Sequence, residues 1–161
     1  MKKVCIALVI VLYSTTALAS PTFAEGSEYN FLIDLARKAS DLDVDMTSVA
    51  HAHLNIGNVD SMSTICVDEL TDVTSEMDHD FGELSDLAVI LNQMKVTSDK
   101  AVILKALKVR AKGADTILGN LRDNVNLLAG RCNDPVVAEK TEVLLNFIED
   151  ARPRVESLLS N

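Results

Sequence analysis

The sequence predicts an all-α protein: an up-down-up-down antiparallel four-helix bundle with long helices, preceded by a cleaved signal peptide. Apolar residues recur at alternating three- and four-residue spacings in four long segments, the periodicity of amphipathic helices. Alternating β-branched runs, which mark half-buried strands, are absent. Short connections favour antiparallel neighbours. A three-helix fold or an extended coiled-coil dimer is the alternative, because the same heptads can pair between chains.

Residues 1–24 have the pattern of a bacterial signal peptide. Two lysines precede an apolar run over 4–13, and small-residue cleavage patterns end at Ala19 and at Ala24. The apolar run is about ten residues long, whereas a helix that crosses a bilayer needs roughly 20. We therefore expect cleavage at one of these two sites and a single helical-bundle domain over 25–161. The mature protein would be periplasmic or secreted, without a membrane anchor.

The first amphipathic segment covers residues 32–56 and the second covers residues 66–94. In the first, the apolar rhythm continues without a break until the Gly-Asn pair at 57–58, a combination typical of a helix C-terminus. In the second, the rhythm slips near Phe81 and Gly82, which favours a bend there.

The third and fourth segments follow after short connections. The Thr-Ser-Asp triplet at 97–99 is good N-cap material, and the third helix is expected to end before Gly130. The fourth begins at Asp134 and Pro135, with proline in a first-turn position where its missing N–H costs nothing. Pro153 lies inside the fourth segment, and we expect it to kink or loosen the last turn and a half.

Two cysteines remain after removal of the signal peptide, which contains Cys5. In an oxidising compartment an even pair predicts a disulfide, and two separate buried thiols are the alternative. Cys66 lies near the start of the second helix, and Cys132 lies in the connection between the third and fourth. An up-down-up-down bundle places both positions at the same end, so we predict a Cys66–Cys132 disulfide.

The histidines are the candidate ligands for a metal or a cofactor. His51 and His53 point roughly 200° apart on a helix, so they cannot bind one ion together. His53 follows the apolar stripe, which favours a structural role in the core. The alternative is a bundle that binds haem or a divalent metal through His53 with Met46 or His79. A Cys-x-x-Cys-His attachment motif is absent and aromatic residues are few, so we expect no cofactor.

Acidic residues are concentrated in the first two helices. Lysine and arginine are absent from residues 39–94. Within that stretch four carboxylates are spaced four residues apart, on one face of the second helix: Asp68, Asp72, Glu76 and Asp80. Like charges at this spacing destabilise a helix by a few tenths of a kcal/mol per pair. We therefore expect cations elsewhere in the molecule to offset them.

The turn near residue 96 predicts how the second and third helices face each other. It places Glu83 level with Arg110 and Asp80 level with Gly113. Three lysines and an arginine on the third helix can then neutralise the half of the acidic face nearest the turn: Lys105, Lys108, Arg110 and Lys112. The other half, Asp68, Asp72 and Glu76, has no cationic neighbour in the sequence, and neither have Asp41, Asp43 and Asp45 of the first helix. The acidic face is a candidate docking surface for a basic protein, a cationic peptide or loosely held divalent cations, and a solvated acidic surface is the alternative.

The composition and the motifs restrict the classes of function that fit the sequence. The chain has a formal net charge of −9, which disfavours binding to nucleic acid. Neither a nucleophile elbow nor a glycine-rich phosphate loop occurs, so we do not expect an enzyme. The sequence predicts an exported, acidic, non-catalytic interaction module whose partner is a protein or peptide with a basic surface. Self-association through unused heptad positions is compatible with this prediction.

Overall fold

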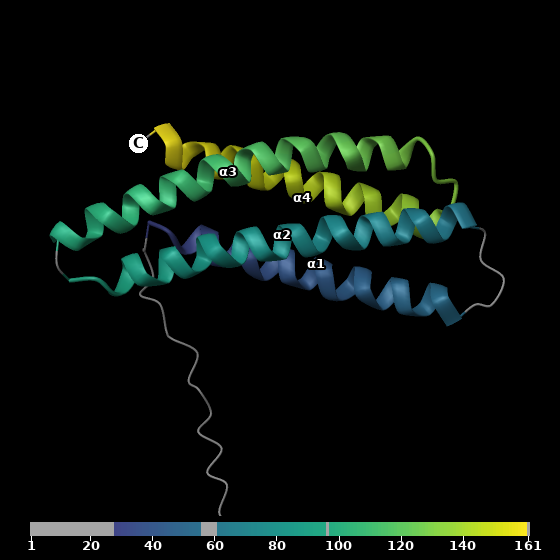
Figure 1. The fold of residues 1–161 in the computed structure, drawn as a ribbon, viewed down its shortest axis with the longest axis horizontal. Coiled ribbons are helices and arrows are strands. Elements are labelled where there is room, and N and C mark those ends of the chain that lie inside the picture. The colour runs from purple at the N-terminus through teal and green to yellow at the C-terminus, as the bar shows by residue number, and fades with distance from the viewer. Residues whose placement is uncertain (1–27, 56–60, 96, 161) are drawn as a thin grey trace, which may run out of the picture.

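The computed structural model describes residues 28–55, 61–95 and 97–160, and every regular element in these ranges is an α-helix (Figure 1). In chain order the helices are α1 (Asn30–Asn55), α2 (Ser61–Gln93), α3 (Thr97–Ala129) and α4 (Pro135–Ser160). Each is antiparallel to the next, so the prediction of an all-α, four-helix-bundle architecture is confirmed. None of these helices has an apolar stretch long enough to cross a membrane. The predicted signal peptide, 1–24, lies outside the described residues.

The helices pack as two antiparallel pairs. α1 lies against α2, and α3 lies against α4, while α2 also packs on α3 (Figure 1). α4 touches α2 and α1 more lightly. An edge-to-face contact between Phe81 of α2 and Phe147 of α4, with ring centroids 5.4 Å apart, connects the two pairs inside the core. α2 therefore packs closely on both α1 and α3 and also contacts α4.

The apolar stripes of the four helices meet in one continuous core. The periodicity that predicted the third segment is confirmed, since the seven apolar residues at three- and four-residue spacings are all buried: Leu107, Ala111, Ala114, Leu118, Leu121, Val125 and Leu128. Thr74 and Thr141 are buried as well, and each hydroxyl donates to a carbonyl of its own helix. These local bonds satisfy the buried hydroxyls. Charged side chains consequently lie on the outer surface or at its edges.

Two helices continue through residues at which the sequence predicted a bend or a kink. α2 remains helical past Gly82, and α4 remains helical through Pro153 to its end. Proline removes one backbone hydrogen bond from a helix interior. Packing on both sides of Pro153 holds α4 in place: Arg152 pairs with Asp115 of α3 at 2.8 Å, and Val155 is fully buried.

A disulfide and a helix cap hold one end of the bundle together. The bond joins Cys66 of α2 to Cys132 in the connection between α3 and α4, with Cα atoms 6.4 Å apart, so the predicted pairing is confirmed. Two residues later, the Asp134 carboxylate accepts the backbone N–H groups of Val136 and Val137, at 2.8 and 3.3 Å. This is N-capping, and it satisfies two otherwise unpaired donors of α4.

Candidate functional site

Three carboxylates form an exposed row on α2, which we call the acidic stripe: Asp68, Asp72 and Glu76. Their spacing of four residues places them on one side of the helix, away from the buried side that carries Leu70 and Met77. Within the described part of the chain, none of the three makes an ion pair or a hydrogen bond. The molecule therefore presents three solvated negative charges along one helix.

The acidic stripe is bordered by exposed apolar side chains. Ile65 precedes Asp68 by about one turn on the same side of α2, and Met62 lies one turn before Ile65, about 120° around the helix from Asp68; the two residues are 50% and 48% exposed. Glu69 is exposed beside them. Cys66 lies in the same turn and is bonded to Cys132. This end of α2 thus combines apolar surface, negative charge and a covalent anchor that limits its motion.

Asp43 and Asp45 of α1 are engaged within the protein, whereas Asp41 is exposed and pairs with no described residue. Asp43 accepts a hydrogen bond from the buried Thr74 hydroxyl of α2 at 3.2 Å. Asp45 pairs with Lys140 of α4 at 2.7 Å, and this hydrogen bond is the main reason why the pKa of Lys140 is raised. Sequence reasoning missed Lys140, because it is 95 residues from Asp45 and no local pattern connects α1 with α4.

Asp80, the fourth member of the predicted acidic face, has a different environment from the other three. It is partly buried, and its Oδ2 atom is enclosed without a hydrogen-bond partner among the described residues. Burial raises the pKa of Asp80, and Glu83 raises it further, whereas His79 and Arg110 act in the opposite direction. Asp80 therefore belongs to the margin of the core, and only three of the four carboxylates form the exposed row.

The predicted register of α2 and α3 is confirmed by one ion pair. Arg110 Nη1 lies 2.8 Å from Glu83 Oε2. The expectation that lysines of α3 also neutralise this face is wrong. Lys105, Lys108 and Lys112 form no ion pair with any described residue, because they lie on a different side of α3 from Arg110. We call these three residues the basic stripe.

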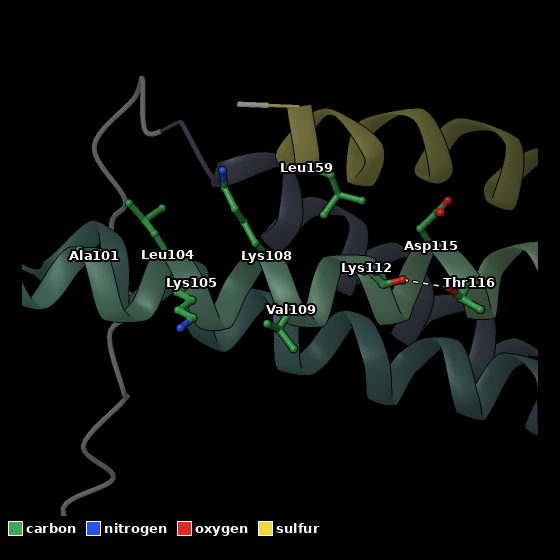
Figure 2. Close-up of a pocket in the computed structure, with 9 residues that line it drawn as sticks. All are labelled: Ala101, Leu104, Lys105, Lys108, Val109, Lys112, Asp115, Thr116 and Leu159. Atoms are coloured by element: carbon green, nitrogen blue, oxygen red, sulfur yellow. Dashed lines mark hydrogen bonds between the residues drawn. The ribbon is translucent and has the colours of Figure 1, made fainter.

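The basic stripe borders a groove of about 870 Å³ on α3 (Figure 2). Its lining is Ala101, Leu104, Lys105, Lys108, Val109, Lys112, Asp115, Thr116 and Leu159. Figure 2 shows Leu104 and Lys108 projecting toward α4, where Leu159 lies, and Lys105 and Val109 projecting to the other side of α3. The groove thus combines three cationic side chains with an apolar surface to which α4 contributes.

The candidate metal and haem ligands are not brought together. Met46 is buried in the core, His53 is partly buried with an unpaired, enclosed Nε2 atom, and the His79 side chain is 75% exposed beside Glu83. Met46 and His53 are about 10 Å apart along α1 at 1.5 Å per residue, whereas metal–ligand bonds are about 2 Å long. In the described ranges no group of three metal-binding side chains forms. The metal or haem alternative stays a prediction without support from this geometry.

Comparisons of this chain with protein-family models, with curated proteins and with solved structures found no match.

Proposed function

We propose that the protein is an exported, non-catalytic interaction module that docks a partner with a basic surface on its acidic stripe. The observation that carries the proposal is that Asp68, Asp72 and Glu76 are exposed and unpaired. Asp45 and Glu83 pair with cations, whereas Asp41, Glu69, Asp78 and Asp86 do not pair with any described residue. The acidic stripe is distinguished by having three such carboxylates at a regular four-residue spacing. Like charges at this spacing repel one another, and a cationic partner removes that repulsion when it binds.

The form of the acidic stripe favours docking over catalysis. Its carboxylates stand on the exposed surface of a helix, whereas carboxylates that act in hydrolysis work in a cleft that shields the reaction from water. The Cys66–Cys132 bond anchors the same end of α2. A rigid surface loses little entropy on binding, which favours affinity.

Export is supported by two features. Residues 1–24 have the order of a signal peptide, with basic, apolar and small residues in succession. Disulfides such as Cys66–Cys132 persist in oxidising compartments, which include the periplasm and the extracellular space. The proposed partner is accordingly a protein or peptide that is present outside the cytoplasm.

The proposal is tested by neutralising the acidic stripe with the substitutions Asp68→Asn, Asp72→Asn and Glu76→Gln. Isothermal titration calorimetry with a lysine-rich amphipathic peptide measures the binding. We expect affinity to fall by about tenfold or more, since three surface charge pairs of about 0.5 kcal/mol each are lost. Stability should remain the same or rise slightly, because like-charge repulsion is removed.

A matched control removes the same amount of charge from α4, with Glu139→Gln, Glu142→Gln and Glu149→Gln. All three positions are exposed, and this variant should bind the peptide nearly as well as the wild type. If the variant lacking the acidic stripe retains full affinity, or if both variants lose affinity equally, the proposed docking surface is wrong.

A further inference from the structure

The basic stripe and its groove are the second unpaired charged surface of the bundle. Lys105, Lys108 and Lys112 are exposed and have no carboxylate partner among the described residues. Exposed apolar side chains accompany them on α3, since Val102 is 68% and Val109 is 66% exposed. A surface of this composition suits an amphipathic helix that carries acidic residues, because the helix can bury apolar area and neutralise the lysines together.

We propose that the partner of the acidic stripe is a second copy of this chain, which receives the stripe in its α3 groove. The inference rests on the proposed function and identifies the partner that docks on the acidic stripe. Charge complementarity is the argument for this occupant: the acidic stripe has three carboxylates and the basic stripe has three lysines. At 1.5 Å per residue, the first spans about 12 Å of α2 and the second about 10 Å of α3.

The apolar surroundings of the two stripes also match. Met62 and Ile65 lie beside the acidic stripe, and Val102 and Val109 lie beside the basic stripe, with all four side chains more than 40% exposed. When α2 of one copy lies along α3 of another, these side chains can be buried together while the charges pair. Leu159 of α4 adds a wall to the groove.

The two stripes do not pair with each other within one molecule: no ion pair joins them among the described residues. The pairing of Glu83 with Arg110 aligns α2 with α3, and at 1.5 Å per residue this alignment separates the stripes along the bundle by about 30 Å at their far ends, Asp68 and Lys105, and by about 8 Å at their near ends, Glu76 and Lys112. A neighbouring molecule can bring all three pairs of charges into contact together. Because the two surfaces differ, one contact uses the acidic stripe of one copy and the basic stripe of the other, and the pair of copies retains one free stripe of each sign.

The net charge of −9 limits the strength of this contact. Two copies repel each other at long range, and the stripes attract each other only at distances within the Debye length, which is about 10 Å at 0.1 M salt. We therefore expect weak, concentration-dependent association at moderate ionic strength, and sedimentation equilibrium over a wide range of protein concentrations is the suitable measurement.

Two charge-reversed variants test the contact. In the first the acidic stripe becomes basic through Asp68→Lys, Asp72→Lys and Glu76→Lys. In the second the basic stripe becomes acidic through Lys105→Glu, Lys108→Glu and Lys112→Glu. Each variant alone brings like charges together, so the rise of average mass with concentration seen in the wild type should be lost. An equimolar mixture contains both complementary pairings, and the rise in mass should return.

Circular dichroism of each variant provides the control for folding, and recovery in the mixture independently shows that both variants are folded. A wild type that remains monomeric at every concentration, or a mixture that fails to associate, overturns the inference. If the monomeric wild type still binds the lysine-rich peptide through its acidic stripe, the proposed function stands and only the second copy is wrong. If the wild type is monomeric and laurate shifts the NMR signals of the basic stripe, the groove binds an anionic amphiphile instead.

Discussion

Asp80 shows at the scale of one residue how the environment separates carboxylates that look equivalent in the sequence. It continues the spacing of Asp68, Asp72 and Glu76, yet it is partly buried and one of its oxygens is enclosed without a hydrogen bond from the described residues. Burial of a charged group without a partner is unfavourable. The acidic stripe is exposed and does not incur this cost, so its charges are available for a partner.

We expect Asp80→Ala to stabilise the protein at neutral pH by about 1 kcal/mol, because it removes an enclosed charge and raises helix propensity. The pKa of Asp80 is raised in the folded state, so the folded state binds this proton more tightly than the unfolded state does. The advantage of the variant over the wild type should therefore shrink as the pH falls through the pKa of folded Asp80. Urea unfolding at several pH values measures this difference.

Asp86→Ala is the matched control for this prediction. Asp86 is exposed on the same helix, so the substitution provides the gain in helix propensity of about 0.5 kcal/mol without any relief of burial. If both variants show the same stabilisation at every pH, the burial of Asp80 makes no contribution.

At the scale of an element, the first turn of α4 is stabilised by residues that are close together in the sequence. Asp134 caps the helix through two backbone N–H groups, and Pro135 follows in the position where proline costs no hydrogen bond. The Ser63 hydroxyl of α2 lies 3.5 Å from the other carboxylate oxygen of Asp134. The Asp134 side chain thus caps α4 and also contacts α2.

Asp134→Ala should destabilise the protein by about 1 kcal/mol, because the two capped N–H groups of α4 lose their acceptor. Chemical denaturation measures the loss. Asp134→Asn retains a side-chain oxygen at the same position and should recover most of the stability. Equal losses in the two variants would contradict a capping role for Asp134.

At the scale of the whole molecule, the bundle has chemically different ends. The disulfide and the acidic stripe lie at the end where α1 connects to α2 and α3 connects to α4, while the basic stripe lies toward the other end (Figure 1). Such a distribution of charge favours contacts that bring the acidic end of one copy to the basic end of another, and disfavours parallel contacts that bring like ends together.

The disulfide also connects the two helix pairs covalently. Its cysteines are 66 residues apart, and closing a loop of this length stabilises a protein by about 4 kcal/mol in the chain-entropy model. Reduction of the wild type should therefore lower the denaturant midpoint by a corresponding amount. The double variant Cys66→Ala/Cys132→Ala should unfold near the reduced wild type and should not respond to reductant. Equal midpoints for the oxidised and reduced wild type would contradict this prediction.

The four helices, the disulfide and the alignment of α2 with α3 could all be predicted from the sequence. Apolar periodicity is a local property, so the buried positions of α3 could be read without knowledge of its neighbours. A short turn leaves two helices little freedom to slide, which is why Glu83 could be paired with Arg110. The up-down order placed Cys66 and Cys132 at one end without any further information.

The partners and the burial of the charged side chains could be known only from the tertiary structure. The pairing of Asp45 with Lys140 depends on how α4 sits against α1, two helices that are distant in the chain. The partial burial of Asp80 and the isolation of the three lysines of the basic stripe depend on how α2 and α3 are rotated about their own axes. Periodicity specifies which side of a helix faces the core, but side chains at the edge of that side are buried or exposed by small rotations that arise only when all four helices pack together.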